Sequence, residues 1–196
     1  MKGVRPLYQD EIEKVLNSFS GNYEMRDRNL FVLGIKTGMR ISELLSLTVK
    51  DVWQYDQPVD MLSLRKQVVK GKQEARAIPL NKDAKKAIRE LQEWLSTQVV
   101  ELTPDTPLFI SQKSQKGNEP ISRMQAHRIL NEAFRKAGLT GKLASHSMRK
   151  SFGTRIYTAT KDIMVTKELL GHANVNTTQK YIGVGMDTLR AAVDAI

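Results

Sequence analysis

The sequence predicts a mainly α-helical domain with one small antiparallel β-sheet, an α+β fold. Through most of the 196 residues, apolar side chains recur three and four positions apart, as they do along amphipathic helices. Residues 61–80 differ, because two apolar-bearing segments flank a polar turn that contains glycine, which is typical of a β-hairpin. The composition, with 40% hydrophobic and 27% charged residues, is that of a globular chain.

The N-terminal helices follow from this spacing and from helix-end signals. Four apolar residues at i, i+3, i+4 and i+7 predict a helix over roughly 8–20. A second helix is expected over about 26–36, with an interruption at Thr37-Gly38. We then expect Ser42 to cap a short helix that carries several leucines.

The central part of the chain combines the hairpin with a long helix. Pro79 is expected at the exit of the hairpin or on its edge, because proline cannot donate a ladder hydrogen bond. Asn81 then begins an amphipathic helix. Residues 101–120 contain three prolines and many polar residues. They are expected to form a loop with one short strand near Leu108-Phe109-Ile110.

The C-terminal part is predicted to be helical. Ser122 is expected to cap a helix that Gly138 ends. Further helices are expected at about 147–159, 162–170 and 176–182. A turn at Gly171-His172 precedes the last of them. Gly183 and Gly185 break the last helix, and a final amphipathic segment follows. No internal repeat or linker divides the chain, so we expect one domain over residues 1–196.

Several classes of protein are excluded by what the chain does not contain. It has no cysteine, which excludes disulfides, thiol catalysis, zinc ribbons and iron–sulfur clusters. The three histidines are far apart, and no H-E-x-x-H, G-x-S-x-G or P-loop motif is present. We therefore expect no metal and no cofactor. No apolar run approaches the ~18 residues that span a bilayer, and the N-terminus does not resemble a secretory signal, so we expect a cytoplasmic protein.

The net charge of +10 is distributed unevenly along the chain. Residues 1–60 hold 8 basic and 9 acidic residues, whereas residues 61–196 hold 23 basic and 12 acidic residues. Two stretches concentrate the excess: residues 65–89 with nine basic and two acidic residues, and residues 113–155 with ten and two. Such a distribution favours a polyanionic partner, with nucleic acid first and an anionic membrane surface as the alternative.

Chemistry-bearing residues stand at breaks between the predicted helices. Taken singly, each has an ordinary structural interpretation. An arginine after a glycine turn often pairs with a nearby carboxylate, here Glu43. A histidine before a helix is often a cap or a hydrogen-bonded core residue, and a tyrosine in an apolar helix usually packs in the core. Taken together they form an ordered set of polar side chains. The set comprises Arg40, His146, Arg149, His172 and Tyr181.

In this order the motifs resemble the catalytic domain of the tyrosine recombinases, the phage integrase family. The resemblance rests on four motifs in order, namely TGMRISELLSL, a basic hairpin ending in IPL, HSMRKSFGT, and LLGHANVNTTQKY. It extends from about Leu7 to Tyr181, with nine residues from His172 to Tyr181. Met148 is a conservative departure from the leucine that usually precedes the second arginine.

The resemblance implies a role for each residue. Tyr181 would attack a DNA phosphorus and form a 3′-phosphotyrosyl bond, so that strands can be rejoined without ATP or a metal ion. Arg40 and Arg149 would hold the phosphate oxygens. His146 would be the base-like partner of the tyrosine, and His172 a further donor to the phosphate. Glu43 would orient the site and hold Arg40.

The lysine that protonates the leaving 5′-oxygen in this family lies in the hairpin turn. Lys70, which precedes a glycine, matches it best, while Lys66 and Lys72 share its strand parity and stay open as alternatives. The basic stretches would then contact the DNA backbone. The expected DNA contacts are Lys66, Lys72, Arg76, Arg123, Lys150 and Arg155.

The implied partner is double-stranded DNA, held by a C-shaped clamp of which this domain is half. Complete family members carry an N-terminal core-binding domain as the other half, and here the catalytic fold begins within about ten residues of Met1. The chain is therefore expected to be either a catalytic domain separated from a longer protein or an unusually short member. We expect a monomer in isolation and a homotetramer on DNA when full length. A type IB topoisomerase and a non-enzymatic DNA-binding regulator are the alternatives.

Overall fold

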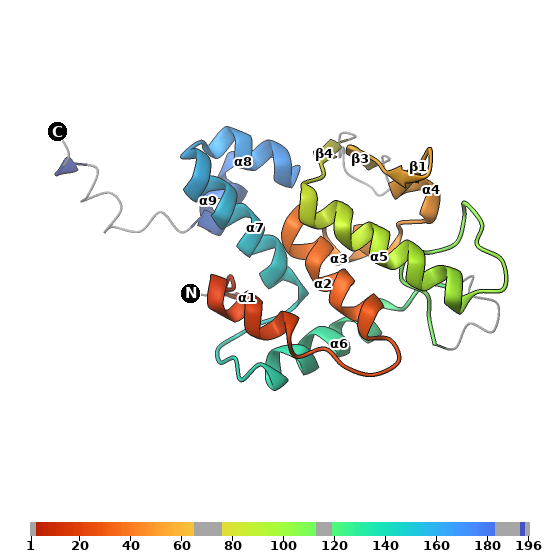
Figure 1. The fold of residues 1–196 in the computed structure, drawn as a ribbon. Helices are drawn as coiled ribbons and strands as arrows, with labels where there is room; N and C mark the ends of the chain where they lie inside the picture. The colour runs from red at the N-terminus through yellow and green to blue at the C-terminus, as the bar shows by residue number, and fades with distance from the viewer. Residues whose placement is uncertain (1–2, 65–75, 113–118, 183–192, 195–196) are drawn as a thin grey trace.

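The computed structural model describes residues 3–64, 76–112, 119–182 and 193–194 (Figure 1). The helices are α1 (Gln9–Leu16), α2 (Glu24–Thr37), α3 (Ile41–Leu45), α4 (Val49–Val52), α5 (Lys82–Gln98), α6 (Arg123–Lys136), α7 (Ser145–Thr160), α8 (Ile163–Leu170) and α9 (Val175–Ile182). The strands are β1 (Trp53–Gln54), β2 (Gln57–Pro58), β3 (Met61–Leu64) and β4 (Arg76–Pro79). The fold class is confirmed: it is mostly helical, with small antiparallel sheets.

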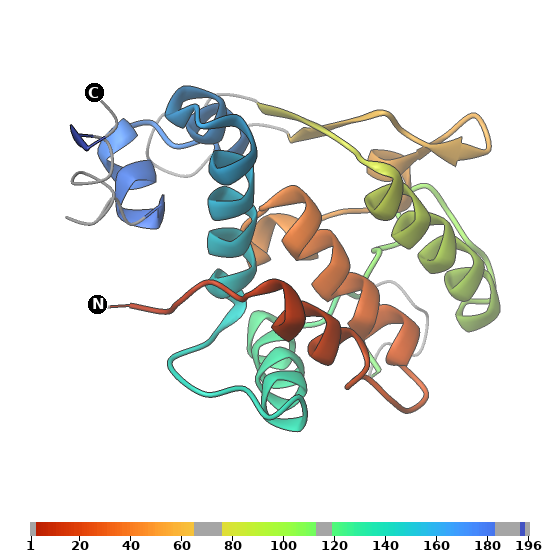
Figure 2. The ribbon, with the colours of Figure 1, turned by 60° about the vertical axis from the view of Figure 1, so that its left-hand side comes forward.

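Helix α2 is the centre of the fold, with α5 packed on one side and α7 crossing its C-terminal end (Figures 1 and 2). One apolar cluster joins α2, α3, α5 and the β3–β4 hairpin, and it includes Leu30, Leu44 and Ile78. A second cluster joins α1, α2, α6 and α7 through residues such as Phe31 and Phe134. Burial of these two faces of α2 provides the main driving force that fixes the helices around it.

The crossing of α2 and α7 is close because glycines lie in it. A Cβ atom on Gly34 would lie 2.6 Å from Sδ of Met148, and one on Gly38 would lie 2.3 Å from the ring of Phe152. Gly38 also ends α2 in the left-handed conformation, with φ 62°. The expected interruption at Thr37-Gly38 is therefore confirmed, and it brings the end of α2 against the first turns of α7.

The β3–β4 hairpin is confirmed, with Met61 opposite Pro79 and Leu64 opposite Arg76. Pro79 lies at its exit, as expected. The segment between its two strands, with Lys66, Lys70 and Lys72, lies outside the described residues.

Some local expectations were wrong. Ser42 does not cap α3, because Arg40 occupies the N-cap position and the Glu43 carboxylate accepts from its backbone N–H. The first helix ends at Leu16, four residues before the expected end. Instead of a strand, residues 108–110 are a buried segment, with one isolated bridge just before it at Pro107 and one at Ile110 itself. These residues are apolar because they fill the core. A short buried apolar run cannot be distinguished from a strand by its sequence pattern alone.

Helix α4 and the β1–β2 hairpin were not expected. The hairpin turns through Tyr55 and Asp56, whose φ angles are 51° and 58°. The sequence signal of such a two-residue turn is an Asn-Gly, Asp-Gly or Gly-Gly pair, which is absent here.

Among the residues that the structure describes, none of the helices combines the length and the apolarity needed to cross a membrane.

Candidate active site

Helix α7 carries the first two polar residues of the site. His146 and Arg149 lie three positions apart near its N-terminus, so their side chains leave the helix on neighbouring sides of one face. The Arg149 side chain is buried, with only 1% of the residue exposed. Its Nη1 donates to the Gly38 carbonyl at 2.6 Å and its Nη2 to the Leu170 carbonyl at 2.5 Å.

Both acceptors of Arg149 lie where a helix ends. Gly38 follows α2, and Leu170 is the last residue of α8, which Gly171 ends in the left-handed conformation with φ 61°. The last carbonyls of a helix have no intrahelical donor, and the negative end of the helix dipole attracts a cation. Two helix ends therefore hold the guanidinium of Arg149 in place.

Arg40 enters from the start of α3. Its Nη1 donates to Oε1 of Glu43 at 2.7 Å, and its backbone N–H donates to Oε2 of the same carboxylate, also at 2.7 Å. Burial raises the pKa of Glu43, but the Arg40 backbone N–H and the guanidiniums of Arg76 and Arg40 outweigh it, so that this pKa is lowered. Glu43 is thus a carboxylate at neutral pH, and it fixes the direction of Arg40.

Tyr181, on α9, lies between the two histidines. Its hydroxyl is hydrogen-bonded to Nε2 of His146, and its ring meets the rings of His146 and His172 edge-on, at centroid distances of 5.3 and 4.9 Å. The ammonium of Lys150 lies 5.6 Å from the centre of the Tyr181 ring and donates to the Val4 carbonyl.

His172 is 7% exposed, and its Nδ1 shares a hydrogen bond of 3.0 Å with the hydroxyl of Thr178. Burial, followed by the charges of Arg149 and Arg40, lowers the pKa of His172 to about 4. Burial and the charges of Arg149 and Lys150 also lower the pKa of His146. Both imidazoles are therefore neutral at neutral pH, and His146 is free to accept a proton.

The arginines give the site an excess of positive charge. Burial and the charge of Arg40 lower the pKa of Arg149 to about 10, which leaves it charged at neutral pH. Arg40, Arg76 and Arg149 lie together around the single carboxylate of Glu43. Such a cluster attracts an anion, and planar guanidiniums match phosphate oxygens in particular. In the described part of the chain, no three histidine or carboxylate side chains are grouped so that they could hold a metal ion.

The sequence profile of the Phage integrase family matches residues 5–187. The chain belongs to this family. Among its relatives, the probable integrase/recombinase YoeC of Bacillus subtilis (strain 168) is 35% identical over 96% of this chain and 94% of its own length. Tyrosine recombinase XerC of Halalkalibacterium halodurans is 32% identical over 96% of this chain, which spans 62% of that protein.

Solved structures share the fold. The crystal structure of XerA recombinase superposes with a TM-score of 0.74 over 100% of this chain and 66% of that chain, at 22% identity. The XerH site-specific recombinase, in a post-cleavage complex with its difH substrate, superposes with a TM-score of 0.72 over 96% of this chain and 52% of that chain, at 27% identity. The fold is that of a tyrosine recombinase catalytic domain.

The structure brings together six of the residues that the family motifs singled out. They come from α3, α7, the turn after α8, and α9, and they are Arg40, Glu43, His146, Arg149, His172 and Tyr181. Lys70, Lys66 and Lys72 lie outside the described residues. Arg123 and Arg155 are exposed on α6 and α7, while Lys150 is partly buried beside Tyr181.

Arg76 differs most from its expected place. We expected it on the DNA-facing surface of the hairpin, but its side chain is only 8% exposed and is bonded to Glu43 within the site. Strand alternation is the signal that could have found it, because Arg76 lies on the same face of β4 as the buried Ile78. Thr178, the partner of His172, was also missed, since a threonine in a polar helix carries no distinguishing pattern.

Proposed function

We propose that this domain is a site-specific recombinase of the integrase type, which cleaves and rejoins DNA strands through a 3′-phosphotyrosyl intermediate. The observation that carries the proposal is the hydrogen bond between the Tyr181 hydroxyl and His146, beside the buried guanidinium of Arg149. With Tyr181 as the nucleophile, His146 as the proton acceptor and Arg149 as the phosphate-binding charge, these contacts support phosphoryl transfer.

In the proposed cleavage step, the oxygen of Tyr181 attacks the DNA phosphorus while its proton passes to Nε2 of His146. The bond from phosphorus to the 5′-oxygen breaks, and that oxygen leaves with a proton as a 5′-hydroxyl. The phosphorus is then bonded to the oxygen of Tyr181 and keeps its bond to the 3′-oxygen of the cleaved strand. Rejoining is the same step in reverse with a 5′-hydroxyl as the nucleophile, so the energy of the phosphodiester is kept and no ATP is needed.

Arg40 and Arg149 stabilise the charge that develops on the non-bridging oxygens. Catalysis of phosphoryl transfer rests mainly on positioning and on such electrostatic stabilisation. Both guanidiniums are held in place before DNA binds, so they need little reorganisation during the reaction. His172 adds a neutral donor to the phosphate. The proposal requires no cofactor, because the chain's own side chains supply each of these functions.

The proton of the leaving group is assigned to a lysine of the hairpin turn, with Lys70 first and Lys66 and Lys72 as alternatives. Arg123, Arg155 and Lys150 are proposed to contact the backbone of double-stranded DNA. We infer that the chain in isolation is a monomer and that recombination assembles four copies on DNA. The site of action is then the cytoplasm, at the nucleoid. Membership of the integrase family favours recombination over the topoisomerase and regulator alternatives.

Covalent capture tests the proposal and finds the DNA site at the same time. A nicked library of DNA fragments is incubated with the protein and denatured, and DNA that stays attached to protein is sequenced. We expect one enriched sequence with the wild type and none with Tyr181→Phe, which keeps the aromatic ring but lacks the nucleophile. Tight, salt-sensitive DNA binding without any covalent adduct would instead identify a regulator.

A further inference from the structure

Arg76 is placed inside the active site although it belongs to the hairpin. It begins β4, opposite Leu64 of β3, and its side chain is 8% exposed. Both of its terminal nitrogens have partners: Nη2 donates to Oε2 of Glu43 at 3.0 Å, and Nη1 donates to the Leu170 carbonyl. A guanidinium that donates in two fixed directions acts as a rigid bridge.

Each partner of Arg76 also holds one of the two phosphate-binding arginines. The Glu43 carboxylate accepts from both the side chain and the backbone N–H of Arg40. The Leu170 carbonyl accepts from Nη2 of Arg149. Arg76 therefore lies between the two anchors, one acidic and one a backbone oxygen, and links them directly.

The backbone leaves room for this bridge at one position. Gly171 has φ 61°, and a Cβ atom there would lie 2.8 Å from Cδ of Arg76. Any other residue would press against the arginine at the point where it reaches Leu170. The glycine of the LLGH motif thus ends α8 and also admits the side chain of Arg76.

We propose that Arg76 is a positioning residue, which fixes Glu43 relative to the Leu170 carbonyl and thereby sets the spacing of Arg40 and Arg149. This inference rests on the proposed function, because the spacing matters only if the two arginines share one phosphate. A lysine cannot replace Arg76, since a single ammonium does not span two acceptors in a fixed fork.

The first test needs no DNA. In nuclear magnetic resonance spectra, a guanidinium held by fixed acceptors rotates slowly and gives resolved Nη signals. We expect resolved signals for Arg149 and Arg40 in the wild type, and shifted signals for both in Arg76→Met, because each keeps its own acceptors while the two anchors move relative to one another. Arg89→Met removes an exposed arginine of α5 and should change neither. Unchanged signals in Arg76→Met would overturn the inference whether or not the protein cleaves DNA.

The second test measures cleavage of the captured DNA site. We expect the cleavage rate to fall about a hundredfold in Arg76→Met, which is the size of effect that misplaced catalytic groups have. Arg76→Lys should keep the fold and still lose about tenfold or more. Full activity of Arg76→Lys would contradict a bridging role. Thermal unfolding of both variants shows whether they are folded.

The third measurement separates positioning from general structural support. A methylphosphonate at the cleavage position has no negative charge, so its reaction depends less on the arginines. If Arg76 acts through Arg40 and Arg149, the deficit of Arg76→Met should shrink by about tenfold or more on this substrate. An equal deficit on both substrates would overturn the inference. If the wild type forms no adduct with any DNA, the proposed function fails, and the spectra still decide the positioning role.

Discussion

Arg149 is almost fully buried, and backbone oxygens rather than carboxylates are its direct partners. Burying a charge is costly unless hydrogen bonds compensate it. The carbonyls of Gly38 and Leu170 provide that compensation without neutralising the charge. This leaves the positive charge available to a phosphate. At the scale of single residues, backbone oxygens therefore anchor Arg149, and its charge remains for the anion binding that we propose.

The buried, positively charged surroundings of His172 disfavour its protonated form. Its pKa is lowered to about 4 from the ordinary value of 6.5, so protonation favours the unfolded chain. Above pH 6.5 the imidazole is neutral in both the folded and the unfolded chain. As the pH falls from 6.5 towards 4, the unfolded chain binds a proton on this residue and the folded chain does not, so the fold loses stability. Across that window we expect a loss in the free energy of unfolding of up to about 3 kcal/mol from this residue.

Urea unfolding at several pH values between 7 and 4 measures this loss. His172→Gln should lose much less stability than the wild type over the window. His127→Gln, which changes an exposed histidine of α6, should behave like the wild type. If His172→Gln and the wild type lose stability in parallel, the histidine is not buried in its neutral form.

At the scale of elements, the site is built where helices end. The C-termini of α2 and α8 supply the acceptors for Arg149, and the start of α3 supplies the contact between Arg40 and Glu43. Helix termini carry backbone groups without intrahelical partners, so they can fix side chains from distant parts of the chain. The left-handed glycines after α2 and α8 end each helix at the position that the arginines need.

Substitution of Gly38 tests this role of the helix end. Alanine at φ 62° is strained, and its Cβ would also lie 2.3 Å from the ring of Phe152. We expect Gly38→Ala to lower the free energy of unfolding by about 2–4 kcal/mol, the sum of backbone strain and overpacking. It should also reduce cleavage, because the Gly38 carbonyl moves away from Arg149.

The matched control is Gly138→Ala. Gly138 has a similar φ of 69°, but nothing lies within 4 Å of the added Cβ. It should cost about 1 kcal/mol, from backbone strain alone. Equal losses of stability in the two variants, measured by chemical denaturation, would show that the contact between α2 and α7 is not tight.

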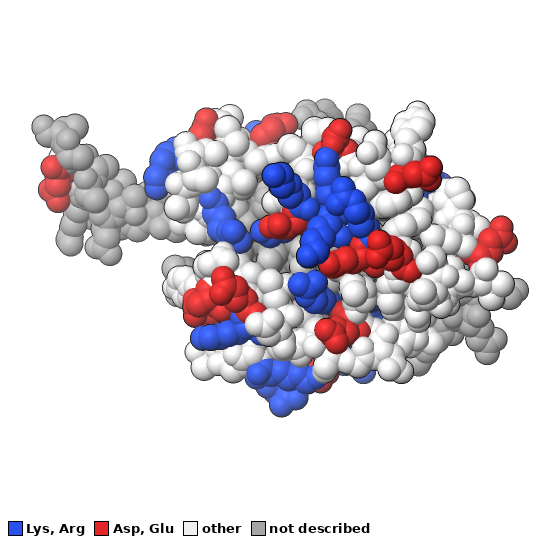
Figure 3. All heavy atoms as spheres, viewed as in Figure 1, with Lys and Arg blue, Asp and Glu red and all other residues white. Residues whose placement is uncertain are grey.

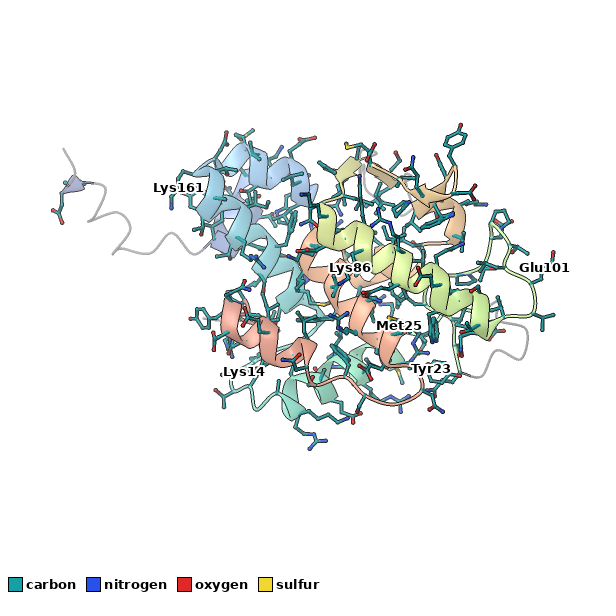
Figure 4. The ribbon with its side chains drawn as sticks, viewed as in Figure 1. Lys14, Tyr23, Met25, Lys86, Glu101 and Lys161 are labelled. Carbon is teal, nitrogen blue, oxygen red and sulfur yellow. The ribbon has the colours of Figure 1, made fainter. Side chains whose placement is uncertain are left out.

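At the scale of the whole molecule, the net charge of +10 overstates the surface available to DNA. Lysines and arginines gather over α5, where acidic side chains stand among them (Figure 3). Lys36 pairs with Asp83 at 2.5 Å, and Lys85 pairs with Asp60. Lys86 lies on the exposed side of α5, within 3.8 Å of Glu90 (Figure 4). Part of the basic stretch 65–89 is therefore balanced within the fold.

The salt dependence of DNA binding tests this division of charge. We expect this chain alone to bind a short duplex in the micromolar range or more weakly, as non-specific binding does, with affinity falling steeply as salt rises. Arg123→Ala should reduce the slope of log affinity against log salt by about 1. Lys85→Ala, which removes an ion-paired lysine, should leave the slope unchanged. The reverse ranking, measured by fluorescence anisotropy, would contradict the proposed DNA face.

Most of the fold, and the list of candidate site residues, followed from the sequence. Apolar spacing located the long helices and the β3–β4 hairpin, because burial of one face imposes a period that is visible locally. The motifs around Arg40, Arg149, His172 and Tyr181 named the site through family resemblance. The β1–β2 hairpin was missed because its turn uses Tyr55-Asp56 instead of the Asn-Gly, Asp-Gly or Gly-Gly pairs that signal such turns.

Only the tertiary structure decided how those residues meet. Arg149 bonds to the carbonyl of Gly38, which is 111 positions away, and Arg76 to that of Leu170, which is 94 positions away. Backbone carbonyls are the same in every residue, so no sequence pattern can show which of them will accept a hydrogen bond. That choice depends on where the packing of α7 and α8 against α2 brings two helix ends. Strand alternation could have shown that Arg76 faces inward, but only the fold shows that it bonds to Glu43 and to the Leu170 carbonyl.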